Sequence, residues 1–357
     1  MQSPKPRRKK SSRRRRFLFK SVVLLFVSVV CVGILEIGVR MLAPQAPSWL
    51  RVYRSHPRLP MALEANAHAI VDTGETRWEV WTDEQGHRRA GSPVQDDRPT
   101  ALWLGDSFLF GHGVNHEETW VGRLDAQQDG RFRHMNHGVP GYGPTHYEIV
   151  LDEALNSEGT VSMVFVATYL GNDFHDTIWL KNNVIRGGVV GNDGSFKSWL
   201  QRNLHSYRLT ARVAHRLGGR VAREESALTD LRTPAAWKVS PMRDAIRKYT
   251  DAMAGIARAC AKRSIPLVVV VIPSVGMVVA TRDRGAVTSA DTPDERGTLF
   301  RALSILQGLD VRVIDTTPTL AKHDPDVLYF SFDGHFSPLG HQVVGDLVLR
   351  DVPELQK

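Results

Sequence analysis

The sequence predicts a three-layer α/β/α domain built on a parallel sheet and preceded by a single membrane-crossing helix. Three observations lead to this expectation. Short apolar runs typical of buried strands recur along the body of the chain, helical patterns fall between them, and one long apolar stretch follows a basic N-terminal tail. Strands that alternate with helices form parallel sheets that are covered on both faces.

The basic residues are concentrated in the N-terminal tail. Ten of the 46 Lys and Arg lie within residues 1–20, which hold no acid, so the rest of the chain, with 38 Asp and Glu, is near neutral. A charge excess confined to one tail, with no basic stripe along the body, argues against nucleic-acid binding.

Residues 17–39 are expected to form a transmembrane signal-anchor helix after a cytoplasmic tail, residues 1–16. The run from Phe17 to Leu35 carries one charge, at Lys20, and it ends at Glu36. As a helix this run is roughly 28 Å long, close to the roughly 30 Å hydrocarbon core of a bilayer. Positive charge ahead of the span predicts a cytoplasmic N-terminus and a periplasmic body, as in a single-pass protein of a bacterial-type inner membrane.

A cleaved export signal is the alternative for the same segment. Cleavage needs small residues in a small-x-small pattern after the apolar run, and Pro44 and Gln45 interrupt that spacing. We therefore favour an uncleaved anchor.

The body divides into a short β-rich lead-in, residues 40–97, and a larger domain, residues 98–355. In the lead-in, the alternation from Thr76 to Thr82 predicts a strand. Residues 182–240 of the larger domain break the order of strands and helices. Four glycines, at 187, 188, 191 and 194, precede a basic, helix-like segment from Phe196 to Leu217. We expect this stretch to be an insertion or a lid.

The elements of the larger domain follow from length and periodicity. Runs of four to seven residues rich in Val, Ile and Leu predict buried strands, the clearest being the one bounded by Pro266 and Pro273, and longer segments with apolar residues at three- and four-residue spacing predict helices. The strands expected from such runs are 101–104, 161–167, 267–272 and 311–314, with a less apolar one at 134–139. The expected helices are 118–127, 146–156, 243–263 and 294–309.

Ser107 follows directly after the first expected strand of the larger domain. In an open parallel sheet, ligands bind beyond the carboxyl ends of the strands, so this serine lies where chemistry is expected. Near the other end of the chain, Asp333 and His335 supply a carboxylate and an imidazole two positions apart, the two groups that convert a serine into a nucleophile. Leu109 replaces the last glycine of the G-x-S-x-G pattern, which excludes the nucleophile elbow of α/β-hydrolases.

Two further turns follow later strands at positions suited to an oxyanion hole. Gly141 lies in a glycine-rich turn after the second expected strand, and Asn172 lies in a turn after the third. The backbone N–H of Gly141, the side-chain amide of Asn172 and the N–H of Ser107 can together supply three donors to a tetrahedral intermediate.

These residues, in this chain order, resemble the four blocks of the GDSL, or SGNH, hydrolase superfamily over roughly residues 98–350. The resemblance implies a flavodoxin-like three-layer fold, with Ser107 as nucleophile and His335 as base. It also implies that Gly141 and Asn172 complete the oxyanion hole. We expect neither a metal nor a cofactor in this chemistry.

One departure from the common family pattern concerns the acid. The family usually has Asp three residues before His, where this chain has Phe332, so Asp333 is the candidate carboxylate. An Asp-x-His block is similar to that of alginate O-acetyltransferase-type members. Ser337 and Pro338 predict the start of the last helix, which leaves Asp333 and His335 in an extended loop where residues two apart can face the same side.

Other polar and aromatic residues have simpler interpretations. Asp106 is expected to tighten its turn, His341 to pack in the last helix, and Trp103 to lie in the core. A metal site is a weaker alternative for His112 with His116, at i, i+4 spacing, and for His175 between Asp173 and Asp176.

The function expected from the sequence is that of a membrane-anchored serine esterase acting on O-acyl esters, of which O-acetyl groups of cell-envelope carbohydrate are the leading candidates. One alternative is a polysaccharide O-acetyltransferase with the same site, which would need a membrane partner to deliver the acyl group. Another is a non-catalytic envelope binding or scaffold protein on the same fold. The acyl group, the acceptor and the oligomeric state stay open.

Overall fold

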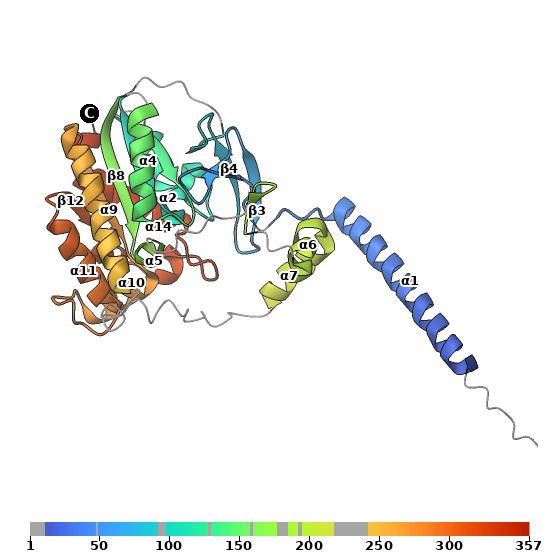
Figure 1. Cartoon of the computed structure of the whole chain (residues 1–357). Coiled ribbons are helices and arrows are strands. Elements are labelled where there is room, and N and C mark those ends of the chain that lie inside the picture. The colour runs from blue at the N-terminus through green and yellow to red at the C-terminus, as the bar shows by residue number, and fades with distance from the viewer. Residues whose placement is uncertain are drawn as a thin grey trace, which may run out of the picture. The chain divides into compact units, whose positions relative to one another are not determined.

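The computed structural model describes residues 11–47, 49–91, 98–127, 130–157, 160–176, 185–191, 195–217 and 242–356 (Figure 1). The chain forms two compact units, Met1–Pro47 with Gly194–Leu217, and Ser48–Asp193 with Gly218–Lys357. Of the expected cytoplasmic tail, residues 1–10 lie outside the described residues, and so do residues 182–184, 192–194 and 218–240 of the expected insertion.

An eight-stranded sheet forms the centre of the larger unit, in the order β12-β11-β8-β6-β7-β5-β4-β3. The first five of these strands are parallel, as expected, and they are β6 (Thr100–Gly105), β7 (Arg133–Gly138), β8 (Val161–Tyr169), β11 (Leu267–Ile272) and β12 (Arg312–Asp315).

The lead-in extends this sheet with three antiparallel strands, so the sheet is mixed and not parallel throughout. These strands are β3 (His68–Asp72), β4 (Arg77–Thr82) and β5 (Arg88–Arg89), and β5 pairs with β7. Along β4, buried and exposed residues alternate: Trp78 and Val80 are buried, whereas Arg77 and Glu79 are exposed. One face of the strand is therefore covered and the other faces solvent, as is common for antiparallel strands at the edge of a sheet.

Helices cover both faces of the parallel strands. Along β6, Leu102 and Leu104 face one core cluster, whereas Ala101 and Trp103 face the other, and all four are buried. The first cluster contains residues of α4 (Pro144–Ser157), α9 (Met242–Lys262) and α11 (Glu295–Gln307), and the second contains residues of α3 (Trp120–Asp125), α10 (Val275–Arg284), α12 (Thr317–Leu320), α13 (Pro325–Leu328) and α14 (Pro338–Asp351). The three layers predicted from the sequence are therefore present.

Caps explain why some helices begin later than their apolar periodicity suggests. The Thr119 side chain accepts from the Gly122 N–H and starts α3, and Asp294 accepts from the Arg296 N–H and starts α11. Ser337 caps α14 with Pro338 as the first helical residue, as the sequence predicts.

Two small hairpins complete the larger unit. One pairs β1 (Tyr53–Arg54) with β2 (Ala62–Leu63), and the other pairs β9 (Ile185–Arg186) with β10 (Val189–Val190). The Tyr53 N–H donates to the Gly188 carbonyl over 3.0 Å, so the second hairpin, which belongs to the expected insertion, is tied to the lead-in.

The smaller unit contains α1 (Ser11–Leu42), α6 (Phe196–Asn203) and α7 (His205–Leu217). Within α1, the segment Arg15–Leu42 is long enough and apolar enough to cross a membrane. The helix-like segment expected at 196–217 is two helices that are separated at Leu204.

Candidate active site

Ser107 begins a short helix directly beyond the carboxyl end of β6. Asp106 caps this helix, α2 (Ser107–Phe110), by accepting the Phe108 N–H over 2.9 Å. At Gly105, a Cβ would lie 2.6 Å from the Leu109 Cβ, so only glycine lets α2 turn back this closely onto its strand. Ser107 is 8% exposed at this turn.

His335 is presented by a closed loop, residues 329–337, between α13 and α14. Tyr329 pairs with Phe336 in an isolated antiparallel bridge, and the Phe330 N–H donates to the His335 carbonyl over 2.8 Å. Gly334 has φ +79°, a left-handed conformation that glycine adopts without strain. These contacts join the two ends of the loop and so fix the backbone that carries Asp333 and His335.

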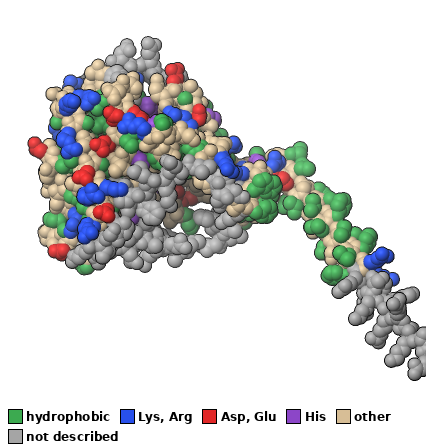
Figure 2. Space-filling model, in the orientation of Figure 1, with side chains coloured by type: hydrophobic (Ala, Val, Ile, Leu, Met, Phe, Trp, Pro, Cys, Tyr) green, Lys and Arg blue, Asp and Glu red, His purple; other side chains and the backbone are tan. Residues whose placement is uncertain are grey.

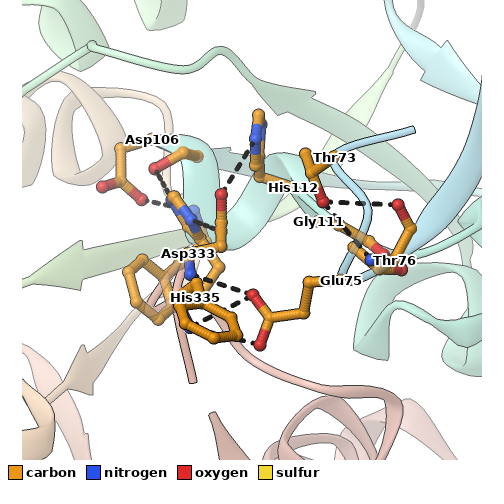
Figure 3. A network of polar contacts seen from close by, with 12 residues as sticks. Thr73, Glu75, Thr76, Asp106, Gly111, His112, Asp333 and His335 are labelled. Atoms are coloured by element: carbon orange, nitrogen blue, oxygen red, sulfur yellow. Dashed lines mark hydrogen bonds and ion pairs between the residues drawn. The ribbon is translucent and has the colours of Figure 1, made fainter. Parts of the chain in front are cut away.

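The structure brings Ser107, His335 and Asp333 together. Figure 3 shows Asp333 and His335 side by side in this network. The Nε2 atom of His335 lies 2.7 Å from the Ser107 hydroxyl, and its Nδ1 atom is hydrogen-bonded to the Asp333 carboxylate. Because a carboxylate only accepts, Nδ1 carries the proton, and Nε2 keeps a lone pair directed at the serine. The side chains of Asp333 and His335 meet as the sequence predicts, but through a turn with Gly334 in the left-handed conformation and not through an extended loop.

The charge state of Asp333 fits this arrangement. Burial acts to raise the pKa of Asp333, but the hydrogen bond from His335, the charge of that ring and the nearby His112 outweigh burial and lower the pKa below its usual value. Asp333 is therefore ionised at neutral pH and can hold the imidazole in one tautomer.

Gly141 and Asn172 lie at the same edge of the sheet as Ser107. β6 is hydrogen-bonded to both β7 and β8, and these strands end at Gly138 and Tyr169, three residues before Gly141 and Asn172. Burial raises the pKa of Asp106 to about 6, and the side chain of Asn172 is among the groups that oppose this rise, so Asn172 lies beside the residue that caps α2. The oxyanion-hole roles of Gly141 and Asn172 stay predictions.

A buried acid anchors the turn that carries Asn172. The Asp173 carboxylate accepts the Tyr169 N–H over 3.0 Å, the Thr168 hydroxyl over 2.7 Å and the Tyr147 hydroxyl over 2.9 Å. Burial and the proximity of Asp106 raise the pKa of Asp173. These bonds fix the start of α5 (Asp173–Asp176) against β8.

Glu75 is a residue of the site region that the sequence did not indicate. It lies in the turn between β3 and β4, and its carboxylate accepts the backbone N–H groups of Phe332 and Asp333, each over 3.1 Å (Figure 3). The lead-in thus holds the loop that carries the candidate base. No sequence spacing reveals this contact, because it depends on how the antiparallel strands pair at the far side of the sheet.

Arg88 and His112 join the lead-in to the chain that follows the candidate nucleophile. From β5, the buried Arg88 guanidinium donates to the carbonyls of Phe110, Gly111 and Val114. His112 lies in the segment held in this way, with its Nε2 atom 3.5 Å from an oxygen of Asp333. Burial, together with the charge of His335, lowers the pKa of His112 to about 4, so this ring is neutral at pH 7.

The ligand atoms of His112, Asp333 and His335 lie within 4.8 Å of one another, and among the described residues this is the group suited to a metal. It includes neither His116 nor His175, so the metal pairs considered from the sequence are not brought together as such a group in that part of the chain. Asp333 and His335 already form the hydrogen-bonded chain to Ser107.

The residues interpreted as structural are packed as expected. Asp106 caps α2, and buried His341 lies against Trp120, with ring centroids 4.9 Å apart. Trp103 is buried, stacks on Phe165 with ring centroids 4.1 Å apart, and donates its Nε1–H to His134.

Comparison with known proteins gives limited similarity. No family model and no curated protein matches the chain. Among solved structures, it is 13% identical to a member of the lipolytic protein G-D-S-L family from Veillonella parvula DSM 2008, over 70% of this chain and 96% of that one, with a TM-score of 0.39.

Two other similar structures carry esterase names. AlinE4, an SGNH-hydrolase family esterase, is 16% identical over 62% of this chain and 77% of its own, with a TM-score of 0.32. The acetyl xylan esterase AlAXEase is 10% identical over 71% of this chain and 99% of its own, with a TM-score of 0.41. At these values the assignment of function depends on the geometry of the site.

Proposed function

We propose that this protein is a serine esterase of the SGNH type that acts on O-acyl esters, with O-acetyl groups of cell-envelope carbohydrate as the leading substrate class. The observation that carries the proposal is the hydrogen-bonded chain from Asp333 through His335 to the Ser107 hydroxyl, formed by segments more than two hundred residues apart in the sequence. A buried serine, imidazole and ionised carboxylate in this order are the parts that acyl transfer through a serine requires.

In the proposed reaction, His335 Nε2 takes the Ser107 proton while Oγ forms a bond to the ester carbonyl carbon. The resulting oxyanion is held by donors from Ser107, Gly141 and Asn172. The imidazolium then gives its proton to the alcohol oxygen as the ester C–O bond breaks, which leaves an acyl-enzyme. In the second step an incoming hydroxyl gives its proton to His335 as its oxygen bonds to the acyl carbon. His335 then returns that proton to Ser107 Oγ as the bond between Oγ and the acyl carbon breaks, which frees the serine.

Hydrolysis and transfer differ in the molecule that accepts the acyl group. Water gives an esterase, and a sugar hydroxyl gives a polysaccharide O-acetyltransferase. The Asp-x-His spacing, which is similar to that of alginate O-acetyltransferase-type members, is the reason for keeping transfer as the second candidate. Transfer would need a membrane partner as acyl donor.

Hydrolysis and transfer can be distinguished by measuring where the acetyl group goes. The full chain in detergent is incubated with p-nitrophenyl acetate, with and without an oligosaccharide acceptor. An esterase releases free acetate at the same rate in both samples. A transferase instead forms acetylated oligosaccharide at the expense of free acetate.

We further propose that α1 crosses a bacterial-type inner membrane once and that the catalytic unit lies on the periplasmic side. The apolar segment Arg15–Leu42 and the basic residues ahead of it support this orientation. Protease added to sealed, right-side-out vesicles is expected to digest the catalytic unit.

The remaining alternative is a scaffold protein with an idle site. A fluorophosphonate probe separates the two, because it reacts only with an activated serine. Labelling that is lost in Ser107→Ala and in His335→Ala supports the enzyme. A native chain that stays unlabelled supports the scaffold.

A further inference from the structure

In the smaller unit, an acidic residue near the end of α1 holds the start of another helix. The sequence presents Glu36 only as the charge that ends the apolar run, yet it is 8% exposed on a helix whose other residues are mostly exposed. Its carboxylate accepts the backbone N–H groups of His205 over 2.9 Å and Ser206 over 2.8 Å, and the Ser206 hydroxyl over 2.7 Å. Glu36 therefore supplies to α7 the acceptor that an N-cap side chain supplies in other helices.

Further hydrogen bonds join the same two regions. Arg40 donates to Glu36 and to the Asn203 carbonyl at the end of α6, each over 2.6 Å. The Gln45 N–H donates to His205 Nδ1 over 2.8 Å, and Arg208 donates to the Gln45 carbonyl over 2.6 Å. We call Glu36, Arg40 and Gln45, with these partners, the Glu36 clasp, and α6 with α7 the α6–α7 hairpin.

The position of the clasp along α1 sets its level in a bilayer. This step rests on the proposed membrane span. From Phe17 to Leu35 the helix covers roughly 28 Å, about the thickness of the hydrocarbon core, with the basic tail at one end. Glu36 then lies at the boundary between the hydrocarbon core and the headgroups, on the side of the bilayer opposite to the basic tail. The clasp holds the α6–α7 hairpin at that level.

The hairpin has the composition of a helix that lies in a membrane interface. Phe196 is 73% exposed, Trp199 52% and Val213 45%. The rings of Phe196 and Trp199 stack, with centroids 6.0 Å apart. Residues 196–217 contain five Lys and Arg and no Asp or Glu. Exposed aromatic residues on a segment that carries basic residues and no acid of its own suit the headgroup region of an anionic bilayer.

We propose that the α6–α7 hairpin is a second membrane-contacting element that inserts its exposed apolar residues into the outer headgroup region of the bilayer crossed by α1. Figure 2 shows apolar side chains along α1, and the clasp joins the hairpin to the end of this apolar surface. The hairpin adjoins the apolar surface of α1, and its basic residues are opposite in charge to anionic lipid. Lipid is therefore the partner that we propose for the exposed residues of the hairpin. The stretch interpreted from the sequence as an insertion or lid thereby includes part of the anchor.

The test measures where the hairpin lies in the full chain. With Cys31 and Cys260 replaced by Ala, Trp199→Cys carries a bimane label, and the chain is placed in vesicles of phosphatidylcholine and phosphatidylglycerol. Nitroxide lipids are expected to quench this label several-fold more than the same label at Asp251→Cys, an exposed position on α9. A label at 199 that iodide quenches as readily as the control, and that nitroxide lipids do not quench, would overturn the proposal and favour a protein partner.

A second measurement separates the hairpin from the span. Alkaline carbonate releases the chain if α1 does not cross the bilayer, and then both the anchor and this inference are wrong. A chain that resists carbonate but shows no lipid quenching at position 199 contradicts the hairpin alone.

The clasp itself is tested with Glu36→Ala, which makes α1 more apolar and so preserves insertion. The amides of His205 and Ser206 are expected to exchange with deuterium more than tenfold faster, and lipid quenching at position 199 is expected to fall. Glu36→Gln keeps an acceptor oxygen and is expected to give a smaller change. An Ala variant with unchanged exchange and unchanged quenching would refute the role given to Glu36.

Discussion

Replacing Glu75 by Ala tests whether the lead-in positions the loop that carries Asp333 and His335. The substitution removes two hydrogen bonds, to the N–H groups of Phe332 and Asp333, each over 3.1 Å. Such bonds to a partly exposed carboxylate contribute about 1 kcal/mol each, so their loss costs about 2 kcal/mol. If the whole of this free energy is lost from the stabilisation of the transition state, kcat falls roughly 30-fold.

The assay is steady-state hydrolysis of p-nitrophenyl acetate by the full chain. Because Glu75 touches the loop and not the ester, kcat is expected to fall while KM changes little. Glu75→Gln keeps an acceptor oxygen and is expected to lose only a few-fold. Glu84→Ala removes an exposed acid from the next turn of the lead-in and serves as the matched control. A folded Glu75→Ala enzyme with kcat within twofold of the native value would refute the reasoning.

Three further predictions concern the site and its support. Asp333→Asn is expected to lower kcat roughly 10³–10⁴-fold, measured in the same assay, because an amide can donate to His335 and favour the wrong tautomer; an effect below tenfold would contradict this. Gly105→Ala is expected to lower both the thermal midpoint and kcat, since its Cβ would meet Leu109 at 2.6 Å, and an unchanged midpoint would exclude the clash. Burial lowers the pKa of His146 from 6.5 to about 4, so the unfolded chain binds a proton that the native chain does not between these values. Native stability therefore falls as the pH drops from 6.5 to 4, by about 2–3 kcal/mol from this group, and urea unfolding of His146→Gln should lack that part of the pH dependence.

The sequence was sufficient for the parts of the site that follow strands or begin helices. Ser107 could be located because an apolar run ends three residues before it, at Leu104. His335 could be located because Ser337 and Pro338 predict the start of the helix that follows it. The local pattern thus determined which residues lie at the carboxyl edge of the sheet.

Contacts made across the sheet could not be predicted in the same way. Glu75 and Arg88 reach the site because β5 pairs with β7, and no periodicity within the lead-in specifies that partner. The prediction of a parallel sheet did not include the antiparallel strands β3, β4 and β5, because the sequence of the lead-in does not show that they pair with the sheet.

Glu36 shows a similar limit of sequence interpretation. A charge at the end of an apolar run is what any membrane anchor displays, so its partners about 170 residues later stayed hidden. The stretch 182–240 is irregular in sequence, and in the part of it that the structure describes, hydrogen bonds of Glu36 and Arg40 relate it to α1.

The most direct test of the account is to trap the acyl-enzyme. The full chain is mixed with excess p-nitrophenyl acetate, quenched with acid during turnover, digested and analysed by mass spectrometry. The account predicts an acetyl group on the peptide that contains Ser107, and none on that peptide in Ser107→Ala. Turnover that continues without an acetylated Ser107, or that survives Ser107→Ala, would contradict it.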